Sequence, residues 1–170
     1  MRRFWKTPAA LIVLLLTACS VAQEIEIENV PDEVLNDIQL GAFARAYALN
    51  GSMNPFYLRG DFDGDGKPDY AFWIKARSTG AVGIAIWLAA KKSLIILGAG
   101  HAFRVGSTSE TKLDFLNTWK VFGKEPVERG VGAAHPPRLL GDAILVGKRE
   151  SASGLIYWNG KEFAWYQQGD

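Results

Sequence analysis

Cysteine and histidine are scarce in this chain, which has one cysteine, Cys19, and two histidines, His101 and His135, among its 170 residues. A single cysteine excludes an intrachain disulfide. The two histidines form neither an H-x-x-x-H nor an H-E-x-x-H pattern, so they give no sign of a transition-metal site. We expect both to be loop or surface residues.

A surplus of positive charge is also missing, because 19 lysines and arginines face 18 acidic residues and the formal net charge is +1. Loss of Arg2, Arg3 and Lys6 with the leader described below would subtract three positive charges and leave −2. Nucleic-acid-binding domains normally carry a basic excess, so we expect no nucleic-acid partner. Hydrophobic residues at 48% and charged residues at 22% indicate a globular domain.

The apolar run at residues 9–16 is too short to span a bilayer, and it follows a basic start, as in a signal peptide. It leads into Leu16-Thr17-Ala18-Cys19, which resembles the bacterial lipobox and implies lipidation of Cys19. An ordinary signal peptide cut after Ala18 or Ala22 is the alternative. We expect a signal peptide at 1–18, a tether or edge strand at 19–30, and one domain at 31–170.

The N-terminal part of that domain has the pattern of a helix from Pro31 to Leu49, with a proline and acidic residues in its first turn and Asn50-Gly51 after it. Strands are expected after the helix, at 70–75, 81–89, 93–97, 112–122, 139–148, 154–158 and 161–167. The sequence therefore predicts an α+β fold: one N-terminal helix packed on a curved, mostly antiparallel sheet of about six or seven strands.

Two of the expected strands have distinctive features. Residues 81–89 are apolar on both faces, which is typical of a central strand covered on both sides, and the face rich in small residues would let a helix approach closely. Asn159-Gly160 is the preferred pair for a two-residue hairpin turn. With that turn, the strand register would place Ile156 opposite Phe163.

The segment Gly60-Asp61-Phe62-Asp63-Gly64-Asp65-Gly66-Lys67-Pro68-Asp69 has the pattern of a calcium loop. Calcium takes six to eight oxygen ligands, and carboxylates at positions one, three and five converge when a glycine at position six permits a tight turn. Position seven offers a backbone carbonyl, and position nine a carboxylate that binds directly or through water. The candidate ligands are Asp61, Asp63, Asp65, Lys67 and Asp69.

An EF-hand would end in a glutamate at position twelve, where this chain has Phe72 inside a strand pattern. The run GDFDGDGKPDYAF instead resembles the calcium loop of FG-GAP and VCBS-type repeats, with Phe62 as an inward apolar plug. The resemblance implies bound calcium and a β-rich exported protein, and this chain has a single copy of the loop.

Other chemical motifs are incomplete. Ser151 or Ser153 with His101 and Asp142 would make a triad on paper, but no G-x-S-x-G elbow supports it. Gly98-Ala99-Gly100 lacks the third glycine of a dinucleotide fingerprint. We therefore expect no enzyme activity. The tryptophans are assigned to core packing, with a sugar- or peptide-binding platform as the alternative.

Together these patterns predict a calcium-stabilised binding or structural module of the cell envelope, exported to the periplasm and anchored by lipid. Ser20 follows Cys19, and by resemblance to enterobacterial lipoproteins the lack of an aspartate there implies the outer membrane. Its partner would be an envelope protein or cell-wall component. Two other functions stay open. One is a small envelope hydrolase with Asp63, Asp69 or the calcium itself as its active centre, and the other is a periplasmic inhibitor or immunity protein presenting the loop 124–138.

Overall fold

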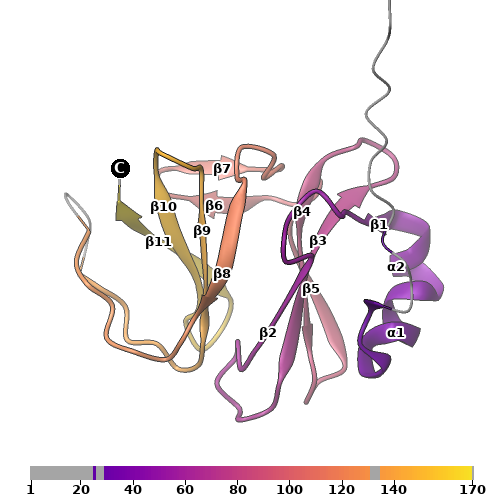
Figure 1. Ribbon diagram of the computed structural model, residues 1–170, viewed down its shortest axis with the longest axis horizontal. Coiled ribbons are helices and arrows are strands. Elements are labelled where there is room, and N and C mark those ends of the chain that lie inside the picture. Colours follow the sequence, from indigo (N-terminus) through magenta and orange to yellow (C-terminus); the bar gives the residue numbers. More distant parts are fainter. Residues whose placement is uncertain (1–24, 26–28, 131–134, 170) are drawn as a thin grey trace, which may run out of the picture.

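The computed structural model describes residue 25 and residues 29–130 and 135–169, which form two short helices, eleven strands and three antiparallel sheets (Figure 1). The expected signal peptide, the lipobox with Cys19, and most of the 19–30 tether lie outside the described residues. No helix in the described part of the chain is long and apolar enough to cross a membrane.

The first sheet has five strands in the order β1-β3-β4-β5, with β2 also paired to β3. Its members are β1 (Tyr47–Leu49), β2 (Tyr57–Gly60), β3 (Asp69–Ala76), β4 (Val82–Leu88) and β5 (Ser93–Gly98). The expected strands at 70–75, 81–89 and 93–97 are confirmed as β3, β4 and β5, and β4 is central and buried on both faces as predicted.

The second sheet has four strands in the order β11-β10-β9-β8. They are β8 (Thr118–Phe122), β9 (Ala143–Gly147), β10 (Ser153–Trp158) and β11 (Phe163–Gly169). A separate hairpin pairs β6 (Phe103–Val105) with β7 (Thr108–Glu110). It connects the two larger sheets along the chain.

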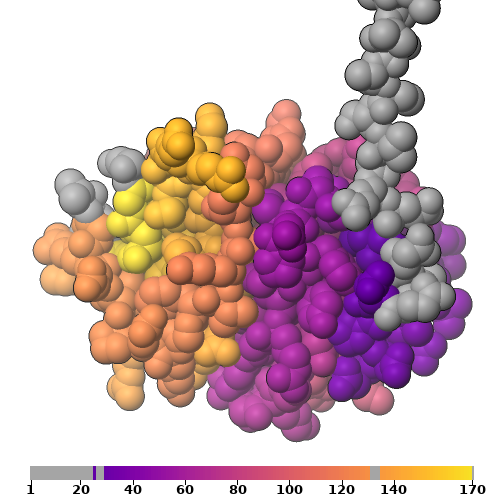
Figure 2. All heavy atoms as spheres, in the orientation of Figure 1, coloured from indigo at the N-terminus to yellow at the C-terminus, as the bar shows by residue number. Residues whose placement is uncertain are grey.

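The two large sheets face each other across the main hydrophobic core. Alternate residues of β3 and β4, including Trp73, Ile84 and Ile86, meet Ile144, Val146 and Ile156 from the second sheet. Two tryptophans also meet there in a T-shaped contact, since the ring centroids of Trp73 and Trp119 lie 5.6 Å apart. In the space-filling view the C-terminal half, orange to yellow, abuts the N-terminal half along this seam (Figure 2). The molecule is therefore a β-sandwich.

Helices cover the outer face of the first sheet (Figure 1). Helix α1 (Asp32–Gln39) buries Val34 and Ile38 against a second core that contains Phe72, Ala85 and Trp87. Helix α2 (Gly41–Ala46) follows. The small-residue face of β4 does lie under helical residues, as its sequence predicted.

The expected architecture of one long helix on a single sheet is wrong. The predicted helix 31–49 ends at Gln39, because Leu40 is extended (φ −116°, ψ 162°) and Gly41 adopts φ +71°, a left-handed conformation that interrupts the helix. After the short α2, residues 47–49 become strand β1 and pair with β3. The fold is mostly β, with three sheets where one was expected.

The C-terminal hairpin exists, but its predicted register is wrong. Ile156 lies opposite Trp165, and Trp158 opposite Phe163, so four residues rather than two form the connection. The Asn159 side chain explains the longer loop, because its Oδ1 accepts hydrogen bonds from the N–H groups of Lys161 and Glu162 at 2.9 Å each. This local side-chain bonding outweighs the two-residue turn preference.

Candidate metal site

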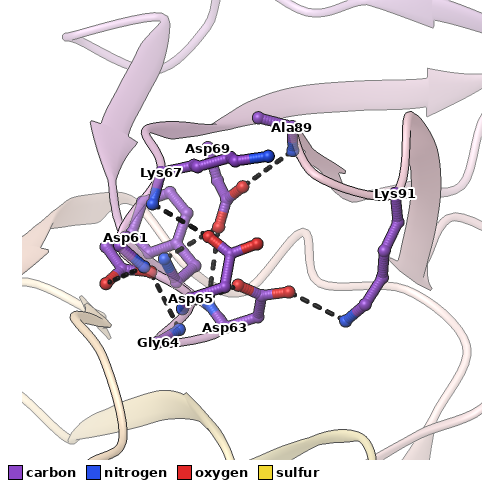
Figure 3. Close-up of polar contacts among 10 residues, drawn as sticks. Asp61, Asp63, Gly64, Asp65, Lys67, Asp69, Ala89 and Lys91 are labelled. Carbon is purple, nitrogen blue, oxygen red and sulfur yellow. Dashed lines mark hydrogen bonds and ion pairs between the residues drawn. The ribbon is translucent and has the colours of Figure 1, made fainter.

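The acidic loop joins β2 to β3 and brings three carboxylates together (Figure 3). One carboxylate oxygen from each of Asp61, Asp63 and Asp65 lies within 4.8 Å of the other two. Asp63 is buried, Asp61 is half-buried and Asp65 is exposed, so the cluster opens to solvent on one side. This triad can hold a metal ion, and its all-oxygen donors suit a hard cation.

Backbone hydrogen bonds to the first aspartate shape the loop. The two carboxylate oxygens of Asp61 accept from the N–H of Gly64 at 2.8 Å and of Gly66 at 3.0 Å. Both glycines adopt positive φ, +79° and +86°, which lets the chain fold back over Asp61. The position-six glycine therefore has the conformational role that the sequence pattern assigned to it.

Phe62 is fully buried in the core between the sheets, which confirms it as the inward plug. Its burial holds the middle of the loop against the sandwich.

Asp69 is fully buried at the start of β3 and is used differently from the triad. Its Oδ2 accepts from the N–H groups of Phe62 at 3.0 Å and Asp63 at 3.3 Å, and its Oδ1 accepts from Ala89 at 2.8 Å. This carboxylate clamps the loop to the end of β4 (Figure 3).

Burial raises the pKa of Asp69 from 3.8 to about 6, and the nearby Asp63 carboxylate raises it as well. The hydrogen bonds from Ala89, Phe62 and Asp63 oppose this shift. The negative charge of Asp69 is therefore only partly stabilised by the protein itself, and a cation close to it would favour the ionised form.

A lysine that the sequence pattern did not single out is paired with the cluster. The Lys91 ammonium lies 2.8 Å from Asp63 Oδ2, and the Asp63 side chain is only 2% exposed. The same ammonium lies 4.9 Å from the centroid of the Trp158 ring. Hydrogen bonding to Asp63 raises the pKa of Lys91, so this residue stays positively charged and offsets part of the repulsion in the loop.

The loop is also docked against the second sheet through residues 140–142, just before β9. Asp142 Oδ2 accepts from the Asp61 N–H at 3.0 Å, and the Asp142 N–H donates to the Asp61 carbonyl at 2.6 Å. The backbones approach so closely that a Cβ on Gly64 would lie 2.6 Å from the Leu140 carbonyl oxygen. The candidate site thus lies where the two sheets meet at one end of the sandwich.

Of the five predicted ligands, the structure gathers Asp61, Asp63 and Asp65, and places Asp69 directly behind them with its oxygens on backbone N–H groups. Lys67 donates its backbone N–H to Asp65 Oδ1 at 2.8 Å. Lys91 and Asp142 are the neighbours that sequence reasoning missed. Lys91 is 28 positions from its partner Asp63, and Asp142 is 81 positions from its partner Asp61. A local sequence pattern does not predict pairs so far apart in the chain.

His101 and Asp142, which with a serine would make a catalytic triad, have other hydrogen-bond partners in the structure. His101 Nε2 shares a 2.7 Å hydrogen bond with the Tyr47 hydroxyl, and the Asp142 carboxylate accepts from the backbone N–H groups of Asp61 and Lys124.

Comparisons with protein-family models, curated proteins and solved structures found no match.

Proposed function

We propose that this chain is a calcium-stabilised binding or structural module of the bacterial cell envelope. The observation that carries the proposal is the convergence of three carboxylates in a loop clamped between the two sheets. Metal held there would tie the start of β3, a core strand, to the segment that leads into β9. Occupancy would then be coupled to the stability of the whole sandwich.

Calcium is the ion that the donor set favours. Asp61, Asp63 and Asp65 would supply carboxylate oxygens, Lys67 its carbonyl, and Asp69 an oxygen directly or through a water molecule. Calcium accepts such irregular sets of six to eight oxygens, whereas magnesium demands a stricter octahedron. The likeness to the FG-GAP and VCBS-type loop supports the same ion, with Phe62 buried as the plug of that pattern.

Export and lipid anchoring belong to the same proposal and rest on the N-terminal sequence. The chain would be lipidated at Cys19 and held at the periplasmic side of the outer membrane, where extracytoplasmic calcium reaches the loop. The lipobox-like Leu16-Thr17-Ala18-Cys19 and the position of the sole cysteine support this part.

Two measurements test the proposal. The intact mass of the membrane-extracted protein should equal a chain beginning at Cys19 plus a diacylglycerol adduct, and Cys19→Ser should release the protein from the membrane fraction. A soluble mature chain that begins after Ala22 would reject the anchor. Calcium binding is tested separately, by the melting temperatures of wild type and Asp65→Ala with and without calcium.

A further inference from the structure

Strand β5 is an edge of the first sheet that no other strand covers among the described residues. It pairs with β4 and ends the strand order, and among the described residues no backbone hydrogen bond reaches residues 93–97 from the other side. Its sequence, SLIILG, contains no charge and no proline. Proteins commonly protect an edge with a lysine, a proline or a bulge, because the open row of N–H and C=O groups can pair with another chain.

The register shows which groups of β5 are open. The Val82 carbonyl accepts from the Ala99 N–H, so alternate residues of β4 from Val82 onwards bond toward β5. Their partners are Leu97, Ile95 and Ser93. The N–H and C=O groups of Leu94 and Ile96 therefore point to the free edge, away from β4.

A cleft lies beside this edge, at the open side of the sandwich between β5 and β11. Its volume is about 530 Å³, and its apolar wall comes from Ile95 and Leu97 on β5 and from Phe103, Phe163, Trp158 and Trp165 opposite. Both indoles are only partly buried. A strand added to β5 would extend the sheet across this opening, and every second side chain would enter the cleft.

The rim of the cleft and the start of β5 carry more positive than negative charge. Arg104 and Lys161 line the cleft, and Lys92 precedes β5, against the single carboxylate of Glu162. All four side chains are exposed, and no ion pair is formed by any of them within the described residues. Lys91 adds nothing to this excess because Asp63 already neutralises it.

We propose that β5 and this cleft bind an extended peptide segment whose apolar side chains alternate with acidic ones. Backbone hydrogen bonds to Leu94 and Ile96 would supply affinity, the aromatic cleft would take the apolar side chains, and Lys92, Arg104 and Lys161 would favour the acidic ones. The partner would be a protein of the envelope, so the inference names a partner class for the proposed binding function and rests on it.

A matched pair of variants isolates the edge. Ile96→Ala and Ile96→Pro lose nearly the same side-chain packing, but only proline removes the outward N–H while leaving the bonds to β4 intact. The probes are capped heptapeptides in which glutamate alternates with valine or phenylalanine, together with counterparts carrying lysine for glutamate. Binding is measured by calorimetry in 1 mM calcium, with amide hydrogen exchange on wild type.

We expect the glutamate peptides to bind, the lysine peptides to bind at least tenfold more weakly, and Ile96→Pro to bind about fivefold more weakly than Ile96→Ala. Exchange at the Leu94 and Ile96 amides should slow when peptide is added. Equal affinity of the two variants, unchanged exchange, or no binding would overturn the proposal. So would a dimer of the free protein that Ile96→Pro dissociates, since β5 would then be a self-pairing edge.

The melting temperature of each sample, recorded with calcium and with chelator, separates the two proposals. A protein that responds to calcium and binds no peptide loses only the peptide inference. A protein that binds the peptides without any calcium response loses only the metal assignment.

Discussion

Asp142 and Asp61 exchange two hydrogen bonds across the junction of the two sheets, although 81 positions separate them in the sequence. The Asp142 carboxylate accepts from the Asp61 N–H at 3.0 Å, and the Asp142 N–H donates to the Asp61 carbonyl at 2.6 Å. The first candidate ligand is therefore positioned by a residue of the C-terminal half.

Replacing Asp142 with alanine should weaken both stability and metal binding. The Asp61 and Lys124 N–H groups would lose their acceptor, which costs about 1 to 3 kcal/mol in unfolding free energy. A looser Asp61 should also raise the calcium dissociation constant. Urea unfolding and calcium calorimetry measure the two effects, with Asp142→Asn as the control because it keeps one acceptor oxygen. An Asp142→Ala protein as stable as wild type would contradict this role.

Asp69 should matter for folding even without metal. Asp69→Ala would leave the N–H groups of Phe62, Asp63 and Ala89 without their buried acceptor, and each unsatisfied donor costs about 1 to 3 kcal/mol. We therefore expect a loss of about 3 kcal/mol or more in chelator, measured by urea denaturation. Asp65→Ala, in the exposed part of the loop, should cost far less under the same conditions. Equal losses for the two variants would show that Asp69 is not the clamp described here.

Lys91 should weaken calcium binding, because its ammonium already lies against Asp63. Lys91→Met would remove a positive charge from the edge of the site and should tighten calcium binding by up to about fivefold, the scale of an ion pair whose lysine is solvent-exposed. The same variant should be slightly less stable in chelator, since the carboxylates lose their counter-charge. Lys92→Met is the matched control, and calorimetry is the measurement. A weaker calcium affinity in Lys91→Met would refute the competition.

The sequence predicts the candidate site because its determinants are local. The alternation of aspartate and glycine, and the apolar Phe62 among polar neighbours, fix a tight turn and an inward plug within ten residues. The sequence also predicts the central strand β4, because both faces of that strand are apolar.

The sequence does not predict the division into two sheets, because an apolar strand face can be covered equally well by a helix or by another sheet. The face of β4 that carries Ile84 and Ile86 meets the second sheet, and nothing local distinguishes that outcome. The helix break at Leu40 has a related cause. A single glycine such as Gly41 weakens a helix by only about 1 kcal/mol and does not by itself end one, whereas the pairing of residues 47–49 with β3 requires the chain to leave the helical path.

The melting temperature of wild type and Asp65→Ala, each with 1 mM calcium, 1 mM magnesium or chelator, tests the central claim most directly. With a dissociation constant of about 0.1 mM, calcium should add about 1.4 kcal/mol to wild-type stability. The wild-type melting temperature should therefore rise in calcium, and much less in magnesium. Asp65→Ala should lose most of that rise. In chelator, its melting temperature should be close to that of wild type in chelator. An identical response of the two proteins to calcium would contradict the assignment of this loop as the metal site.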